Sequence, residues 1–424
     1  MLTPTMDMAK KPVDLLNLHQ RIDVSVLPLY AAAALLWLAA ISGRVAGFTL
    51  SDISTSVFEI ALVGCNLLLL IFYRNGKMAR NTIVFFVFAG VLLPYSLLKN
   101  PMESVLRDFS QIFFVASILF GVYFRKINLP GLISGIFVLA TPILLVYGIE
   151  ETPRYLGTTM STEIAFNLRI PLLFVFCAIL NDLFQNRRIR MWHIVFAVFF
   201  AVYMISIRTR GFHLAVVWTL FTHGAYYALK RGVQSRWKIL GVLAIVIILF
   251  SLFAARSEFL SERYAALSDV PLLGAEALSG DQTLKLRLLF WQMALDEMHD
   301  NWTTRCFGMG FGRYLFLDPW GLNEWDLYPF WMIHNQILSS YVTGGVFLLL
   351  CFFFFVRSVY IESNRSFAVL SFISTIVLYS FFTPVFGDPV TAFLLWASIG
   401  WLAIHGSEVE SQELKVEGLE GSSG

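Results

Sequence analysis

Long apolar runs separated by short polar connectors make up most of the chain. Each run is long enough to cross a hydrocarbon core of about 30 Å as a helix. The pattern predicts an all-α polytopic membrane protein with about twelve transmembrane helices. The expected spans are residues 25–43, 52–73, 81–98, 106–124, 130–149, 164–184, 191–207, 210–229, 238–256, 334–356, 366–382 and 389–405.

One long polar interval, residues 257–333, breaks this alternation. Loops of this length in compact proteins usually carry function, so we expect the interval to cover a functional site. The remaining chain divides into a cytoplasmic N-terminal segment at 1–24, one transmembrane domain over 25–406 and a disordered tail at 407–424. No small-residue cleavage site follows the first apolar run, so we interpret that run as a retained helix.

Lysine and arginine residues concentrate in alternate connectors. Because such residues stay on the cytoplasmic side of a membrane, these connectors are expected to face the cytoplasm. With an even number of spans both termini are then cytoplasmic, and the interval 257–333 faces outward. The cations that set this orientation are Arg74, Lys77, Arg80, Arg125, Lys126, Arg187, Arg188, Arg190, Lys230, Arg231, Arg236, Lys238, Arg357 and Arg365.

Composition excludes several classes of protein. Hydrophobic residues make up 57% of the chain and charged residues 14%, which leaves too few polar side chains to cover a soluble globule. A net charge of +2 argues against a nucleic acid partner. Of the four cysteines only Cys306 lies in the long loop, so neither an outer disulfide nor a metal site is expected.

Two arginines, Arg208 and Arg210, interrupt the charge pattern in an outer connector. A cation is disfavoured there, and a bound anion such as a lipid phosphate would compensate it. Gly211 would permit a tight turn or a close ligand approach. The alternative is that the arginines extend toward the headgroups from a helix end, which suits Arg208 better than Arg210.

The stretch from Asp281 to Asp300 has the periodicity of an amphipathic helix. Its apolar stripe is formed by Leu284, Leu288, Trp291, Leu295 and Met298. Such a helix would lie on the outer membrane surface or across the mouth of the bundle. Arg287 is one turn before Trp291, so it points either into a shared cavity or toward solvent and headgroups.

A glycine-rich turn follows at Gly308-Met309-Gly310-Phe311-Gly312-Arg313. Because it follows no predicted strand, it is not a dinucleotide-binding loop. It is either a plain turn or one whose backbone amides face a ligand. Aromatic and acidic residues come next and would bind sugar rings or form a membrane-interface belt. They are Asp318, Trp320, Glu324, Trp325, Asp326, Tyr328, Phe330 and Trp331.

His334 is expected at the start of a span, where the helix N-terminus would keep its imidazole neutral and able to accept a proton. The alternative is a histidine that hydrogen-bonds locally. We interpret His193, His213 and His223 as structural. No activated nucleophile, zinc spacing or paired outer carboxylates stand out, so neither a metal nor a cofactor is expected.

These motifs, in this order, resemble the O-antigen ligase superfamily over roughly the second half of the chain. The resemblance is carried by Thr209-Arg210-Gly211, Arg287-x-x-x-Trp291, Gly308 to Gly312, His334-Asn335-Gln336-Ile337-Leu338 and Gly344-Gly345. It implies a GT-C-like glycosyltransferase of the Gram-negative inner membrane with a periplasmic active site. Many relatives carry serine at the position of Thr209, which also offers a hydroxyl.

The resemblance further implies metal-independent, inverting transfer of O-antigen from undecaprenyl diphosphate to lipid A–core oligosaccharide. His334 would be the general base, and Arg210 and Arg287 would hold the diphosphate. The expected substrate contacts are Arg208, Trp291, Asn335, Gly310, Gly312 and Arg313.

Other functions remain open from the sequence. An O-antigen or exopolysaccharide polymerase, or an O-linked protein glycosyltransferase, would share the spans and the donor chemistry. A lipid-linked-sugar transporter would instead show mid-span charges and two related halves. The sequence shows few such charges and no convincing repeat.

Overall fold

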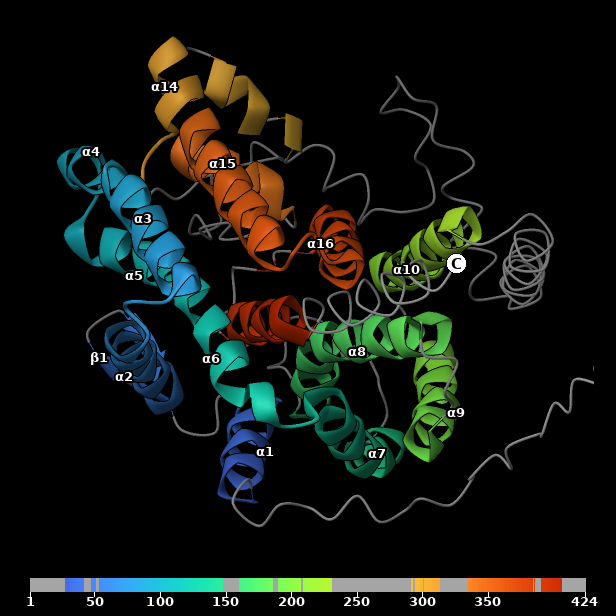
Figure 1. Ribbon diagram of the computed structural model, residues 1–424. Helices are drawn as coiled ribbons and strands as arrows, with labels where there is room; N and C mark the ends of the chain where they lie inside the picture. The colour runs from blue at the N-terminus through green and yellow to red at the C-terminus, as the bar shows by residue number, and fades with distance from the viewer. Residues whose placement is uncertain are drawn as a thin grey trace, which may run out of the picture.

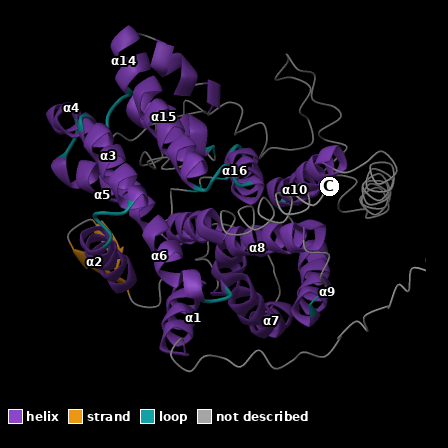
Figure 2. Ribbon diagram, in the orientation of Figure 1, coloured by secondary structure: helices purple, strands orange, loops and turns teal. Residues whose placement is uncertain are grey.

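The computed structural model describes residues 27–41, 47–50, 53–147, 160–185, 190–206, 209–230, 291–292, 294–299, 301–312, 335–383, 385 and 390–405. Within these ranges the architecture is a bundle of helices (Figures 1 and 2). The predicted span 238–256 and most of the interval 257–333 lie outside the described residues, as do the segments 1–24 and 407–424.

The α-helices agree with the apolar runs to within a few residues at most ends. They are α1 (Leu27–Ile41), α2 (Val57–Phe72), α3 (Lys77–Gly90), α4 (Leu92–Lys99), α5 (Met102–Phe113), α6 (Ile118–Tyr123), α7 (Leu129–Tyr147), α8 (Met160–Gln185), α9 (Met191–Ser206), α10 (Arg210–Lys230), α14 (Trp302–Phe307), α15 (Gln336–Glu362) and α16 (Phe367–Ser380). A further apolar helix covers Val390–His405. Short 3-10 turns, Phe114–Ser117 and Phe124–Lys126, flank α6.

A small hairpin adds to this helical architecture before α2. Strand β1 (Gly47–Leu50) pairs antiparallel with β2 (Ile53–Ser56). The expected span at 52–73 therefore begins as a strand, and its helix starts only at Val57. Alternating β-branched residues and the polar character of β2 favour a strand over a helix here.

Four helical segments are long and apolar enough to cross a membrane: Lys77–Lys99, Ser104–Lys126, Asn167–Phe184 and Gln336–Glu362. Several shorter apolar helices accompany them, among them Leu129–Thr141 and Met191–Met204. The chain is thus a multi-pass helical membrane protein, and the full set of twelve spans stays a prediction.

Side-chain contacts fix the relative directions of neighbouring helices. Phe184 stacks on Tyr227 at a centroid distance of 5.1 Å, and Cys177 contacts His223 at 3.9 Å, so α8 and α10 run parallel. The pairs Thr219–Thr375 and Thr222–Ser371, each 2.9 Å apart, make α10 and α16 antiparallel. These hydroxyl pairs hold two apolar helices together where lipid offers no hydrophobic driving force.

Helices α15 and α16 are joined by a short turn at residues 363–366, which makes them antiparallel neighbours. The N-termini of α10 and α15 and the C-terminus of α16 therefore lie at the same end of the bundle. We call this the outer end, following the charge-based orientation. The alternating directions agree with the predicted alternation of spans.

Close helix packing near the centre depends on two glycines. A Cβ atom on Gly121 of α6 would collide with the backbone of Ala397 and Trp401, and one on Gly400 would collide with the carbonyl of Ile118. The helix Val390–His405 therefore lies against α6 at backbone distance. In Figure 1 this unlabelled red helix lies between α6 and α8.

Candidate active site at the outer end of the bundle

Helix α10 begins at Arg210, which is one of the two arginines predicted to hold the diphosphate. The Thr209 carbonyl accepts hydrogen bonds from the amides of Phe212 and His213, at 3.1 and 3.4 Å. Gly211 is buried, and an added Cβ would lie 2.6 Å from the Cβ of Phe382. Gly211 therefore permits a close approach of α10 to the end of α16. Arg208 and the side chain of Arg210 lie outside the described residues.

Helix α15 begins with a well-formed cap. Asn335 is 5% exposed, and its Oδ1 accepts a hydrogen bond from the Leu338 amide at 3.0 Å. The helix therefore starts at Gln336, two residues later than predicted, and His334 directly precedes the cap in sequence. His334 itself lies outside the described residues. The structure assigns Asn335 a capping role, and its contact with substrate stays a prediction.

The predicted amphipathic helix is described at Trp291 and from Ala294 to His299. Ala294 and Met298 are fully buried, whereas Leu295 is 38% exposed. Ala294 and Met298 are thus buried and Trp291 is partly buried against them, whereas Leu295 is the exposed member of the predicted apolar stripe. Arg287 lies outside the described residues.

The buried residues of this helix pack on the first turns of α15. One apolar cluster, which we call the outer cluster, contains Ala294, Met298, Met309, Leu338 and Val342, with Trp291 and Tyr341 packed against it. The long loop is thus joined to α15 by ordinary hydrophobic burial.

Two candidate residues adjoin the outer cluster in sequence. Arg287 is four residues before Trp291, and His334 is four residues before Leu338. Both candidates lie outside the described residues, so their contact with a common substrate stays a prediction.

The glycine turn docks into a break in α15. The amides of Met309 and Gly310 donate to the carbonyls of Val342 and Thr343, at 2.8 and 3.0 Å. At Gly345 α15 is non-helical, with φ of 62°, and a Cβ there would collide with the backbone of Cys306 and Phe307. The Gly344-Gly345 pair thus lets the loop approach the helix at backbone distance.

Residues of α4 and α5 hold the same turn from the other side. The Asn100 amide donates to the carbonyls of Met309 and Phe311, at 3.2 and 2.8 Å. The Phe311 amide donates to Ser96 Oγ at 2.9 Å. The sequence patterns did not predict this anchor.

Asp108 completes the anchor, because its Oδ2 accepts a hydrogen bond from the Gly312 amide at 2.8 Å. Gly308, Gly310 and Gly312 all have positive φ, at 69°, 89° and 80°. The amides of this turn are engaged by the protein, which favours the plain-turn interpretation. Substrate contacts by Gly310 and Gly312 stay predictions, and Arg313 lies outside the described residues.

The histidines interpreted as structural are hydrogen-bonded within the bundle. His213 Nε2 lies 2.9 Å from the Met204 carbonyl, and His223 Nδ1 lies 2.9 Å from the Thr219 carbonyl. His193 Nε2 lies 3.6 Å from a carboxylate oxygen of Asp182. The contacts of His213 and His193 join neighbouring helices, and the contact of His223 lies within α10.

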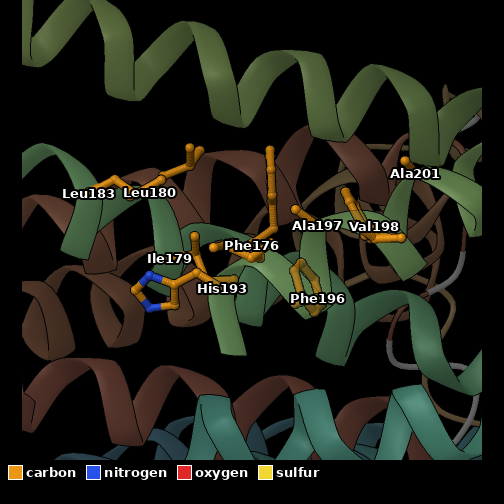
Figure 3. Close-up of a pocket in the computed structure, with 11 residues that line it drawn as sticks. Phe176, Ile179, Leu180, Leu183, His193, Phe196, Ala197, Val198 and Ala201 are labelled. Atoms are coloured by element: carbon orange, nitrogen blue, oxygen red, sulfur yellow. The ribbon is translucent and has the colours of Figure 1, made fainter. Parts of the chain in front are cut away.

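An apolar groove of about 620 Å³ lies between α8 and α9 (Figure 3). Phe176, Leu180, Phe196 and Val198 line it, and His193 is at its rim. None of the predicted site residues lines this groove. Because His193 is close to the start of α9, the groove reaches the opposite end of the bundle from Arg210 and is not the candidate active site.

The described residues contain no group of three or more His, Cys, Asp or Glu side chains able to hold a metal ion. The cysteines Cys65, Cys177, Cys306 and Cys351 are all free thiols.

Residues 194–353 match the family described as O-Antigen ligase. The match supports membership of the O-antigen ligase superfamily. It covers less than half of the chain and contains α10, α14, the outer cluster and most of α15. A comparison with curated proteins finds no match.

The O-antigen ligase match includes the positions of Arg210, Arg287 and His334. Ser96, Asn100 and Asp108, which anchor the glycine turn, lie outside the matched segment. The family match supports a glycosyltransferase-like enzyme of the ligase and polymerase group, and the apolar helices support a multi-pass membrane protein.

Proposed function

We propose that this protein is an O-antigen ligase that transfers a glycan from undecaprenyl diphosphate to a sugar hydroxyl of lipid A–core oligosaccharide. The site would face the periplasm of a Gram-negative inner membrane, below the long loop at residues 257–333. The transfer would need no metal ion. Arg208, Trp291 and Arg313 would contact the substrates around the reacting groups, whereas Asn335, Gly310 and Gly312 would position the segments that carry them.

The convergence of three sequence motifs at the outer end of the bundle carries this proposal. The start of α10, the Asn335 cap of α15 and the outer cluster belong to elements far apart in sequence. Arg210 begins the first of these elements, Arg287 precedes Trp291 of the outer cluster by four residues, and His334 directly precedes the Asn335 cap in sequence. We infer that both arginines and the imidazole reach one cavity at this end.

The reaction we propose is a direct displacement at the anomeric carbon. The acceptor hydroxyl oxygen forms the new bond to that carbon, while the bond to the diphosphate oxygen breaks and the configuration inverts. The proton of the hydroxyl goes to the His334 imidazole, and the electron pair leaves with undecaprenyl diphosphate. Arg210 and Arg287 stabilise the charge on the leaving oxygen.

His334→Ala tests the base assignment. A general base contributes about 10²–10⁴-fold, so transfer should fall by that order while the protein is still made and inserted. Purified protein with lipid-linked glycan and lipid A–core gives the readout. Full transfer by His334→Ala would discard the assignment. Arg287→Ala should raise the donor concentration needed for half-maximal rate more than the acceptor concentration.

The same assay separates the ligase from the alternatives. A ligase joins the glycan to lipid A–core, whereas a polymerase consumes a second molecule of lipid-linked glycan as acceptor. Chain extension without ligation would favour the polymerase. Movement of intact lipid-linked glycan across vesicles, with no covalent product, would favour a transporter.

A further inference from the structure

The apolar groove between α8 and α9 is a feature that the proposed function does not use (Figure 3). All of the residues that line it are apolar except His193. Phe176 and Leu180 of α8 form part of one wall, and Ala197 and Ala201 of α9 form part of the other. The groove is therefore suited to a hydrocarbon chain.

The groove is open toward the surroundings of the bundle. Ala197 and Ala201 are one helical turn apart on α9, and their short side chains leave the space between the two helices unfilled. Leu180 is 6% exposed at the base, whereas Ile194 and Val198 on the α9 wall are 51% and 59% exposed. In a membrane protein such exposed apolar side chains face lipid chains, so the groove opens to lipid.

The length and position of the groove match one leaflet of the membrane. From His193 to Ala201 the α9 wall covers eight residues, which is about 12 Å along a helix. One leaflet supplies about 15 Å of the hydrocarbon core. His193 lies near the start of α9 and Leu183 near the end of α8, so the groove begins at the connector between them. This connector is at the end of the bundle that the charge pattern assigns to the cytoplasm.

A polar cluster marks this end of the groove. A carboxylate oxygen of Asp182 lies 3.7 Å from the guanidinium of Arg190 and 3.6 Å from His193 Nε2. The Arg190 amide donates to His193 Nδ1 at 3.3 Å. The side chain of Arg190 is nevertheless 47% exposed. The cluster thus holds a cation at the mouth of the groove and keeps it accessible.

The connector is more positive than the cluster alone. Arg187 and Arg188, which lie outside the described residues, precede Arg190 in the sequence, so three cations accompany the single carboxylate of Asp182. Guanidinium groups donate to phosphate oxygens. Basic pockets between membrane helices on the cytoplasmic side bind anionic headgroups. An apolar groove with a cationic mouth therefore matches an anionic amphiphile in both shape and charge.

We propose that the groove binds an anionic phospholipid of the cytoplasmic leaflet, with one acyl chain between α8 and α9 and the phosphate at Arg190. The inference does not depend on the proposed function, because the lipid-linked donor would react at the opposite end of the bundle. The bound lipid fills the space between the two helices and stabilises their packing.

Photolabelling of the full chain in detergent tests the proposal. The probe is phosphatidylglycerol with a diazirine in one acyl chain, and the labelled peptides are mapped by mass spectrometry. Residues 176–183 and 194–201 should be labelled in a saturable way. Unlabelled phosphatidylglycerol should compete about fivefold better than phosphatidylcholine with the same acyl chains. Equal competition by the two lipids would indicate ordinary solvation by lipid and would overturn the proposal.

A substitution that fills the groove tests where the acyl chain lies. Ala197→Trp should abolish the labelling of both segments, because the indole occupies the space between the helices. Val87→Trp is the matched control, since Val87 is 65% exposed on α3 and does not line the groove. That control should be labelled like the parent. Unchanged labelling of a folded Ala197→Trp protein would reject the groove as the site.

A second substitution tests the headgroup contact. Arg190→Gln keeps the backbone amide that bonds His193 and should reduce the preference for phosphatidylglycerol over phosphatidylcholine about fivefold. Arg74→Gln removes an exposed cation from another cationic connector and should leave the preference unchanged. If Ala197→Trp unfolds in a thermal melt, Arg190→Gln decides, and an unchanged preference there rejects the proposal.

Two further outcomes would assign the groove to another occupant. Displacement of the probe by undecaprenyl phosphate, but not by phosphatidylglycerol, would indicate a polyprenyl site. The absence of saturable labelling in the groove would indicate that protein covers it, for example the span predicted at residues 238–256. Each of these results overturns the phospholipid proposal, and neither bears on the glycan-transfer assay that tests the proposed function.

Discussion

At the scale of single residues, Gly211 shows how the absence of a side chain positions a candidate catalytic residue. The missing Cβ lets the first turn of α10 pack directly on Phe382 at the end of α16. Arg210 is the neighbouring residue, so its backbone position follows from this contact. The sequence indicated a tight turn or a ligand approach at Gly211, and the structure shows helix packing instead.

Substituting Gly211 tests this packing. Gly211→Val should lower the thermal stability of the purified protein and reduce glycan transfer, because the added atoms would meet Phe382 at 2.6 Å. Gly135→Ala in α7 is the matched control, since its new Cβ would meet nothing within 4 Å. That control should be neutral or stabilising by about 0.5–1 kcal/mol, as expected for replacing a helical glycine. Equal stability of Gly211→Val and the parent would contradict the packing argument.

At the scale of elements, the glycine turn joins three parts of the chain that are distant in sequence. Its amides bond the broken α15 at Val342 and Thr343, and Asn100 of the first half holds its carbonyls. The turn directly precedes the segment that leads to His334. The corner between α4 and α5 therefore fixes Gly312, the last described residue before that segment.

Asn100→Ala should impair transfer by loosening this corner. The substitution leaves the carbonyls of Met309 and Phe311 without their donor, at a cost of about 1–3 kcal/mol. Asn81→Ala is the matched control, because it removes an amide hydrogen bond to Glu362 at the other end of α3 and α15. Both variants should lose thermal stability, and only Asn100→Ala should lose turnover beyond what its folded fraction explains. Equal turnover in the two folded variants would show that the corner is merely structural.

At the scale of the whole molecule, helix directions and charges combine into one topology. Helices α8 and α10 run parallel and α16 runs against them, as alternating spans require. The cationic connectors were expected to be cytoplasmic and the interval 257–333 periplasmic. Under that orientation the start of α10 at Arg210 and the outer cluster both lie toward the periplasmic face.

Thiol labelling of intact cells tests this orientation. In a chain with its four cysteines replaced, Trp302→Cys should react with a membrane-impermeant maleimide from outside, because Trp302 is 70% exposed in the long interval. Asn75→Cys, at an exposed position beside Arg74 in a cationic connector, should react only after the membrane is permeabilised. The opposite pattern would invert the topology and remove the periplasmic site.

Local patterns were sufficient for most of the helices that the structure describes, while the candidate residues stay predictions. Apolar runs located α9 and α10 almost to the residue, because membrane helices satisfy their own backbone hydrogen bonds and depend little on neighbours. The predicted boundaries were wrong where a local feature competes with the continuation of a helix. The β1–β2 hairpin occupies the start of the span predicted at 52–73, and the Asn335 cap makes α15 begin two residues later than predicted.

The sequence by itself determined the membrane class, the helices and the motifs typical of O-antigen ligases. Only the tertiary structure decided that Asn100 holds Phe311, that Trp291 packs near Leu338 and that Gly211 lies against Phe382. The physical reason is the distance along the chain over which each kind of interaction acts. Helix formation in a membrane is governed by hydrophobicity and hydrogen bonds within one segment, whereas the site is built from contacts between segments whose separation along the chain carries no information about their distance in space.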